Sequence, residues 1–190
     1  MLKLYGGARS RASIVQWYLE EIGVPYEFVL LDMAAGEHRQ ADYLALNPMG
    51  KVPAIQEDGP EDQPFTLWES GAILLYLAQK HGHWPASLEA QAQIYQWAFF
   101  ANATLSVALI NEATRDAELP RLLGPVDQVL AQQPFLGGSE FGVIDAILGA
   151  ILSYGVLMFK LDYMPYPAIA AYVEQLMARP AFKKAILKQG

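Results

Sequence analysis

Apolar residues recur at two different spacings near the start of the chain. Residues 2–5 and 26–31 are short apolar runs typical of β-strands. Between them an apolar side chain returns at every fourth position, at Ile14, Tyr18 and Ile22, before a glycine and a proline that end helices. A strand, a helix and a strand in this order predict a right-handed βαβ unit.

The pattern then predicts a short helix, a hairpin and a longer helix. The turn sequence Asp58-Gly59-Pro60 separates two apolar runs and carries the residues that tight turns prefer. The expected elements are a helix at 36–46, strands at 53–57 and 64–68, and an amphipathic helix at 70–80. The predicted order for the first part of the chain is βαβαββα.

A change of pattern marks a domain boundary. Residues 81–87, with the sequence HGHWPAS, combine glycine and proline and show no periodicity, so we read them as a linker. The later sequence shows helical spacing only, at 88–111, 115–132, 142–159 and 166–178, followed by a short tail. We therefore expect an α/β domain at 1–80 and an all-helical domain at 88–190.

Composition narrows the class of protein. Apolar residues make up 53% of the 190 residues and charged residues 17%, which excludes disorder as the main description. The chain contains no cysteine, so it has no disulfide, no cysteine-ligated zinc and no cysteine nucleophile. We predict no metal cofactor.

The net charge of −7 disfavours nucleic acid and anionic membranes as partners. The first residues do not resemble a signal peptide, and the longest uncharged apolar stretch, 146–159, is too short to span a bilayer. A cytoplasmic protein is expected. Although acidic residues predominate before residue 80, four cations lie at helix starts or in loops: Arg9, Arg11, Arg39 and Lys51. They suggest a local anion site, the alternative being scattered surface charge.

The most specific segment is residues 47–55, with the sequence NPMGKVPAI. A Val52-Pro53 step that follows a glycine turn and enters a strand favours a cis peptide. The backbone of Val52 would then face outward, where an extended peptide can pair with it as an added strand.

A second segment, residues 67–73 with the sequence LWESGAI, places an acid and a hydroxyl at the first turn of a helix. Glu69 could hold an ammonium group, while Ser70 and the helix N–H groups could hold a carboxylate. The alternative is that both residues only cap the helix.

Together the two segments resemble the glutathione-binding signature of the cytosolic glutathione transferase family. The resemblance covers nearly the whole chain and implies a thioredoxin-like first domain and an all-α second domain. The start of the first helix, Ser10-Arg11-Ala12-Ser13, and the short chain are similar to the cyanobacterial chi class. The sequence that begins at Pro134-Phe135 and ends at Asp145 resembles the capping motif of the core helix, with Gly142 in place of the usual hydroxyl residue; Asp145 can still accept from free N–H groups.

The resemblance also implies roles for residues, with glutathione as co-substrate and not as a prosthetic group. Val52, before Pro53, would pair with the cysteinyl unit, and Glu69 and Ser70 would hold the γ-glutamyl end. Lys51, and His38 or Arg39, would face the glycyl carboxylate, and Arg11 is a further residue implied to bind glutathione.

A hydroxyl group is expected to stabilise the glutathione thiolate. The family-like candidate is Ser10, whose alternative role is to cap the first helix; Tyr5, at the end of the first strand, is the tyrosine-type alternative. The electrophile would lie against the fourth helix, where Trp97 and Phe100 are the candidates, although aromatic stripes also build cores.

The resulting hypothesis is a homodimeric glutathione transferase that conjugates glutathione to small hydrophobic electrophiles in detoxification. Two alternatives remain open. One is a glutathione-dependent isomerase or peroxidase that uses the same site, and the other is a non-catalytic glutathione-binding module.

Overall fold

The computed structural model describes residues 1–59 and 63–188. The chain divides into two compact units, one formed by Met1–Lys80 with Lys183–Gly190 and the other by His81–Phe182. The residues from Lys183 onward thus group with the first unit, whereas the sequence analysis placed them in the helical domain.

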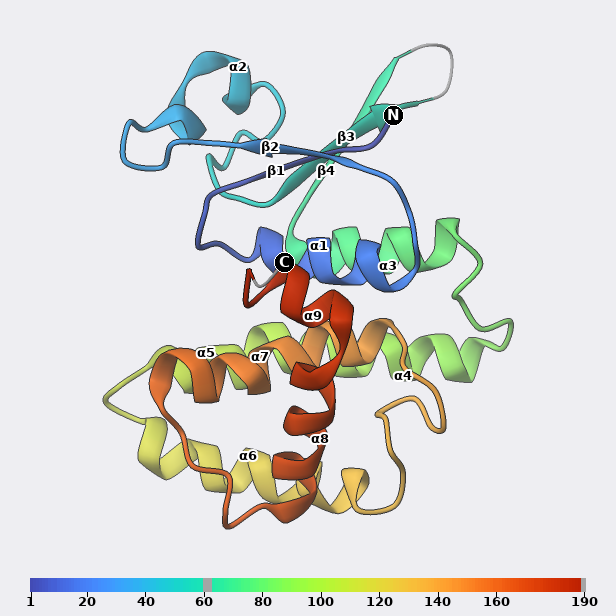
Figure 1. Cartoon of the computed structure of the whole chain (residues 1–190), viewed down its shortest axis with the longest axis vertical. Helices are drawn as coiled ribbons and strands as arrows, with labels where there is room; N and C mark the ends of the chain where they lie inside the picture. Colours follow the sequence, from blue (N-terminus) through green and yellow to red (C-terminus); the bar gives the residue numbers. More distant parts are fainter. Residues whose placement is uncertain (60–62, 189–190) are drawn as a thin grey trace. The chain divides into compact units, whose positions relative to one another are not determined.

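The first unit is built on a four-stranded mixed sheet with the order β2-β1-β3-β4 (Figure 1). Its strands are β1 (Lys3–Gly6), β2 (Glu27–Leu30), β3 (Ala54–Asp58) and β4 (Pro64–Trp68). β1 runs parallel to β2, whereas β3 runs antiparallel to both β1 and β4. The pairing of β3 with β4 confirms the predicted hairpin. Pro60 of the predicted turn lies outside the described residues.

Helices cover both faces of this sheet. α1 (Ala12–Glu21) and α3 (Ser70–Lys80) lie together on one face, and α2 (Ala41–Leu44) lies on the other (Figure 1). Leu4 and Ile55 are fully buried, because alternate residues of the central strands turn toward α1 and α3. The burial of apolar surface between this face and the two helices is the main stabilising contribution.

The prediction of one helix at 36–46 is wrong. The segment forms a short 3₁₀ helix, η1 (Glu37–Arg39), and then α2, with Gln40 in between. The backbone of Gln40 is extended, with φ −79° and ψ 156°, so the helical hydrogen-bond ladder cannot pass through it.

The second unit is entirely helical. Its elements are α4 (Leu88–Phe99), η3 (Phe100–Leu105), α5 (Ser106–Ile110), α6 (Arg115–Leu130), α7 (Val143–Phe159) and α8 (Pro167–Ala178). The segment predicted as one helix at 88–111 is helical from Leu88 to Ile110, but its middle part, η3, is a π-helix. α9 (Pro180–Ala185), the following short helix, falls where the sequence suggested only a tail. A thioredoxin-like α/β unit and an all-α unit confirm the predicted fold class.

α7 is the core helix of this second unit, and Asp145 at its start is fully buried. Its carboxylate accepts hydrogen bonds from the N–H of Leu136 at 2.9 Å, the N–H of Gly142 at 2.8 Å and the hydroxyl of Tyr172 at 2.7 Å. The capping role predicted for Asp145 is confirmed. Burial raises the pKa of this carboxyl above its ordinary value, and the two N–H groups and the Tyr172 hydroxyl counteract only part of the increase.

Among the residues that the structure describes, no helix combines the length and the apolar character needed to cross a bilayer.

Candidate functional site

The sheet register brings three chain segments to one edge of the first unit. Tyr5, near the end of β1, lies opposite Ala54 at the start of β3, and Ala54 in turn lies opposite Trp68 at the end of β4. The loop that follows β1, the residues that precede β3 and the residues that follow β4 therefore meet at this edge. The first and third of these segments lead into the N-termini of α1 and α3, which favour negative charge.

The loop before β3 is held by a network around the carbonyl oxygen of Lys51. It accepts hydrogen bonds from the Tyr43 hydroxyl at 2.5 Å and from Nδ2 of Asn47 at 2.7 Å. Oδ1 of the buried Asn47 accepts from the N–H of Met49 at 3.0 Å. Gly50 has a φ of 59°, a left-handed conformation that glycine adopts at no steric cost. The backbone on either side of Lys51 is thus fixed while its side chain is exposed.

The peptide bond between Val52 and Pro53 is cis, as the sequence predicts. Within residues 1–59 and 63–188, neither the N–H nor the C=O of Val52 has a hydrogen-bond partner. These two groups lie one residue before the paired strand β3 and can receive an extended peptide.

Glu69 links β4 to α3 in an unusual backbone conformation. Its φ is 73°, a left-handed value that costs a residue with a Cβ about 1–2 kcal/mol. Its carbonyl oxygen accepts the hydrogen bond from the N–H of Ile73 at 2.9 Å, which places Glu69 at the cap of α3. Backbone strain of this kind concentrates at functional sites.

Ser70 is the first residue of α3 and is 5% exposed. In the described part of the chain its hydroxyl has no hydrogen-bond partner. Because a helix N-terminus also presents unpaired N–H groups, Ser70 can donate to an anionic ligand without breaking an existing bond.

Ser10, in contrast, has a hydroxyl group that is already engaged. Its Oγ donates to the carbonyl oxygen of Gly7 at 3.0 Å and accepts from the N–H of Gly7 at 3.2 Å and from the N–H of Ala12 at 3.3 Å. Ser10 therefore stabilises the turn before α1. It lies in the expected place, between β1 and α1, with its proton directed to the backbone.

Tyr5 is turned toward the other face of the sheet. Its hydroxyl donates to Oε1 of Gln56 at 3.1 Å, and its ring packs against Tyr43 of α2 with a centroid distance of 6.1 Å. The next residue, Gly6, faces α1, since a Cβ placed on it would lie 2.3 Å from the Cβ of Ala12. Strand alternation therefore directs the Tyr5 side chain away from the start of α1.

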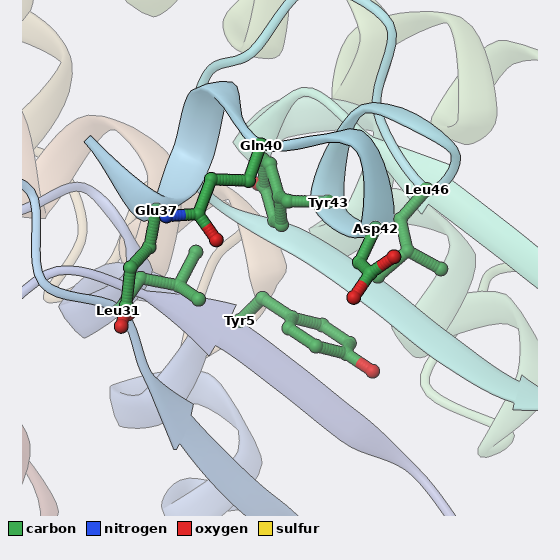
Figure 2. Close-up of a pocket in the computed structure, with 7 residues that line it drawn as sticks. All are labelled: Tyr5, Leu31, Glu37, Gln40, Asp42, Tyr43 and Leu46. Carbon is green, nitrogen blue, oxygen red and sulfur yellow. The ribbon is translucent and has the colours of Figure 1, made fainter.

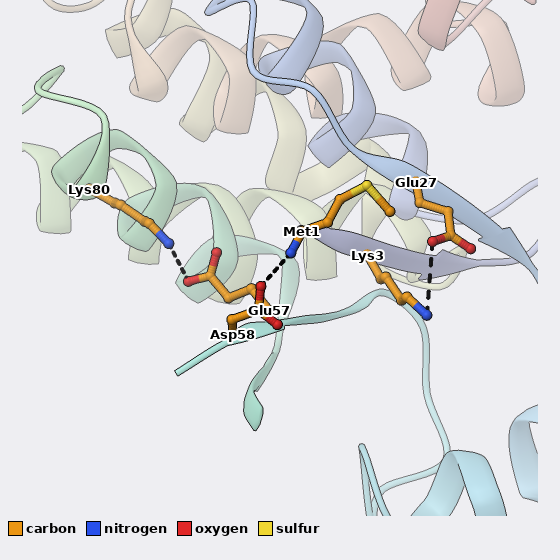
Figure 3. Close-up of polar contacts among 6 residues, drawn as sticks. All are labelled: Met1, Lys3, Glu27, Glu57, Asp58 and Lys80. Atoms are coloured by element: carbon orange, nitrogen blue, oxygen red, sulfur yellow. Dashed lines mark hydrogen bonds and ion pairs between the residues drawn. The ribbon is translucent and has the colours of Figure 1, made fainter. Parts of the chain in front are cut away.

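Several cations of the first unit are paired away from this edge (Figure 3). The terminal ammonium of Met1 lies 2.6 Å from Asp58, Lys3 lies 3.9 Å from Glu27, and Lys80 lies 2.5 Å from Glu57. Lys51 and Arg39 are exposed and, among the described residues, take part in no ion pair. These two cations are available to an anion.

His38 lies next to the loop that carries Lys51. A Cβ on Gly50 would come within 3.2 Å of the carbonyl oxygen of His38, so η1 and this loop are neighbours. Nδ1 of His38 is buried and has no hydrogen-bond partner within the described ranges. A buried polar atom of this kind ordinarily finds a partner. Arg11, at the cap of α1, is half-buried.

Trp97 and Phe100, the predicted electrophile residues, both belong to the second unit. Their rings meet edge to face, with a centroid distance of 5.7 Å and an interplanar angle of 82°. Both residues are half-buried, whereas Phe99 between them is 70% exposed. The pair occupies the junction of α4 and the π-helix η3.

Sequence reasoning did not find the orientation of Ser10 or a cavity on the α2 face of the sheet. Tyr43 of α2 and Leu46, two residues beyond the end of α2, both line that cavity, and the N–H of Leu46 donates to the carbonyl oxygen of Tyr43 at 2.9 Å. In residues 1–59 and 63–188, no three His, Cys, Asp or Glu side chains gather as ligands for a metal ion.

Comparison with protein families decides the identity. The model of the glutathione S-transferase N-terminal domain matches residues 1–79, and that of the C-terminal domain matches residues 90–180. The chain belongs to the glutathione S-transferase family.

Relatives of this glutathione S-transferase are named for different activities. The chain is 33% identical to glutathione S-transferase GstB of Escherichia coli strain K12, covering 98% of both chains. It is 29% identical to the disulfide-bond oxidoreductase YfcG of the same strain, covering 99% of this chain and 95% of YfcG.

Solved structures of the family are also similar. A glutathione transferase from Burkholderia graminis, with two glutathione molecules bound per subunit, is 27% identical with a TM-score of 0.83, over 100% of this chain and 89% of that one. Transferase URE2P6 from Phanerochaete chrysosporium, in complex with oxidised glutathione, is 28% identical with a TM-score of 0.82, over 98% and 95% of the two chains.

Proposed function

We propose that this glutathione S-transferase conjugates glutathione to small hydrophobic electrophiles. Glutathione would bind, and its thiol would be activated, at the edge formed by the loop after β1, the residues before β3 and the residues after β4. The observation that carries the proposal is what converges at this edge: the unpaired backbone groups of Val52, the unpaired hydroxyl of Ser70 and the left-handed backbone of Glu69. Glutathione, an extended tripeptide with an ammonium group and two carboxylates, matches these groups in kind.

The tripeptide would lie with its cysteinyl unit against Val52, in antiparallel backbone pairing. Its γ-glutamyl ammonium would pair with the carboxylate of Glu69, and its γ-glutamyl carboxylate would accept from Ser70 and the N-terminus of α3.

The glycyl carboxylate would then extend toward Lys51 and His38, with Arg39 and Arg11 as further cations on this part of the unit. Lys51 and Arg39 contribute mainly long-range attraction, because both are exposed to solvent. The unpaired Nδ1 of His38 would gain a partner only if the ligand, or a water molecule beside it, reaches η1.

Thiolate formation sets the energetic requirement. A free thiol has a pKa near 8.5, and lowering it by two units takes about 2.7 kcal/mol of preferential anion stabilisation. A hydroxyl donor contributes about 1.5–3 kcal/mol to a charged acceptor, and a helix N-terminus about 0.3–1 kcal/mol. Ser10 and the start of α1 together can therefore supply the shift, provided that the Ser10 proton turns from Gly7 to the sulfur. The orientation of Tyr5 favours Ser10 over Tyr5 in this role.

Trp97 and Phe100 are the proposed contacts for the electrophile. Organic isothiocyanates, activated aryl halides and reactive carbonyls are the substrate classes to assay. The proposal includes a homodimer of the chi class that acts in the cytoplasm in detoxification; sedimentation at micromolar concentration tests the dimer.

A steady-state assay tests the proposal. The purified chain is mixed with glutathione and phenethyl isothiocyanate or 1-chloro-2,4-dinitrobenzene, and the conjugate is identified by mass spectrometry. Conjugation well above the uncatalysed rate is expected, together with its loss when Ser70 and Glu69 are both replaced by alanine. Saturable glutathione binding without turnover of any electrophile would instead identify a binding module.

A second activity, reduction of disulfides by glutathione, is favoured by one observation. The chain is similar to YfcG, a disulfide-bond oxidoreductase, yet contains no cysteine, so both reducing thiols must come from glutathione. Two glutathione molecules would reduce one disulfide to two thiols and form one molecule of oxidised glutathione. Isomerase and peroxidase activities would also use the same thiolate. Parallel assays with hydroxyethyl disulfide and cumene hydroperoxide separate these reactions from conjugation.

A further inference from the structure

A cavity of about 380 Å³ lies on the face of the sheet that carries α2. It is large enough for a small ligand, since such sites begin at roughly 300 Å³. Its lining is formed by Tyr5, Leu31, Glu37, Gln40, Asp42, Tyr43 and Leu46 (Figure 2). All of these residues belong to the first unit.

Two tyrosines, Tyr5 and Tyr43, line this cavity. Their hydroxyl groups already have hydrogen-bond partners, so their rings are the parts that can contact a ligand. The hydroxyl of Tyr5 donates to Gln56, and that of Tyr43 donates to the carbonyl oxygen of Lys51. Leu31 adds an aliphatic surface beside Tyr5 (Figure 2). The face of a tyrosine ring attracts cations and also packs well against methylene groups.

Two carboxylates complete the lining, and no basic residue accompanies them. Figure 2 shows Glu37, from η1, and Asp42, from α2, on opposite sides of Tyr5. One oxygen of Glu37 accepts from the N–H of Asp32 at 2.7 Å, which fixes the side chain and leaves the second oxygen available. Within the described part of the chain, Asp42 has no ion pair. The cavity therefore repels anions such as glutathione and attracts cations.

We propose that this cavity binds a linear aliphatic diamine. One ammonium group would pair with Glu37 and the other with Asp42, while the methylene chain lies over Tyr5 and Leu31. A diamine matches two negative ends separated by an apolar surface, whereas an aliphatic monoamine can satisfy only one of them. None of the residues proposed to hold glutathione lines this cavity, although Glu37 belongs to the same short helix, η1, as His38 and Arg39.

Titration calorimetry of the full chain with putrescine and cadaverine tests the proposal. Saturable binding is expected, with butylamine and pentylamine binding about two- to five-fold more weakly because each loses one exposed charge pair. Asp42→Asn and Glu37→Gln should each weaken diamine binding about two- to five-fold, and the double variant should weaken it further. Glu37→Gln keeps an acceptor for the N–H of Asp32, so η1 should remain folded.

Two controls separate binding in the cavity from general attraction to the acidic chain and from loss of folding. Glu112→Gln removes one exposed negative charge from the second unit and should leave diamine binding unchanged. Asp42→Asn should keep the melting temperature and the glutathione affinity of the unaltered chain. The proposal is overturned if the diamines do not bind, if they bind no better than the monoamines, or if the two pocket variants bind them as well as Glu112→Gln does.

Discussion

Ser10 and Gly7 are joined by two reciprocal hydrogen bonds: the hydroxyl of Ser10 donates to the carbonyl oxygen of Gly7, and the N–H of Gly7 donates to Oγ of Ser10. A serine hydroxyl has a single proton, so Ser10 cannot hold the Gly7 carbonyl and a thiolate at once. Rotation about χ1 or χ2 in the glutathione complex would exchange the neutral acceptor for a charged one, which forms the stronger hydrogen bond.

We therefore expect Ser10→Ala to lower kcat/KM for conjugation about ten-fold or more, since a hydrogen bond to a charged group contributes about 1.5–3 kcal/mol. The measurement is the initial rate at subsaturating glutathione, accompanied by the pH dependence of the rate. Loss of the donor should shift the rising limb of that profile to higher pH.

Two further variants serve as controls for Ser10. Ser13→Ala removes a neighbouring hydroxyl that also donates to a backbone carbonyl, that of Ser10 at 2.9 Å, and should keep most of the activity. Tyr5→Phe should stay within about two-fold of the original rate, because the Tyr5 hydroxyl faces Gln56. An unchanged rate in Ser10→Ala, combined with a lower melting temperature, would leave Ser10 as a helix-capping residue only.

Glu69 allows backbone strain to be separated from ligand binding. Both Glu69→Ala and Glu69→Gly remove the carboxylate, and both should weaken glutathione binding about ten-fold in calorimetry. Only the glycine variant relieves the φ of 73°, so it should unfold at a higher temperature than the alanine variant. If both variants bind glutathione normally, the carboxylate is not a ligand. Ser70→Ala should reduce affinity without changing this conformation.

Lys51 should contribute to glutathione affinity through charge. Lys51→Gln is expected to weaken binding about two- to five-fold at low ionic strength, and the difference should shrink in high salt. Lys3→Gln is the matched control, because Lys3 pairs with Glu27 in the same unit. Equal effects of the two substitutions would indicate general attraction to the acidic unit and not a local contact.

Asp145 should control the stability of the second unit. Asp145→Asn replaces one acceptor by a donor in a buried site that supplies three donors, at a cost of about 1–3 kcal/mol in the free energy of unfolding. Tyr172→Phe removes one of these donors and should destabilise less.

The stability difference should also depend on pH. Because the folded-state pKa of Asp145 is raised, its stabilising contribution is complete below the ordinary carboxyl pKa and decreases as pH rises through the raised value. Urea unfolding should therefore show a larger gap between the original chain and Asp145→Asn near pH 4 than near pH 7. A gap that widens with pH would contradict the assigned direction.

Local sequence patterns predicted most of the fold. Residues 70–80 have apolar spacing and a polar start, and α3 has these bounds. The helix at 36–46 was wrong in detail because apolar spacing does not register one extended residue such as Gln40. The π-helix η3 was not predicted for a related reason. A single wider turn inside a helix changes the apolar spacing too little to be recognised in the sequence. α9 is only six residues long, too short to show a period.

The candidate site could be predicted only in part. Motif spacing indicated Val52, Glu69 and Ser70, and the sheet register brings them to one edge. The left-handed backbone of Glu69 could not be predicted, because nothing about a glutamate favours positive φ. The direction of the Ser10 proton depends on where Gly7 lies, and the cavity around Tyr5 depends on the path between η1 and α2.

The contacts made by the last described residues have a consequence for biosynthesis. Lys184 pairs with Glu20 at 2.7 Å, and Lys188 donates to Gln16 at 2.9 Å. Glu20 and Gln16 both belong to α1. Glu20 leaves the ribosome 164 residues before Lys184 does. These contacts of α1 can therefore form only after the whole helical unit has been translated, so the thioredoxin-like unit is completed after the unit inserted within it has been made.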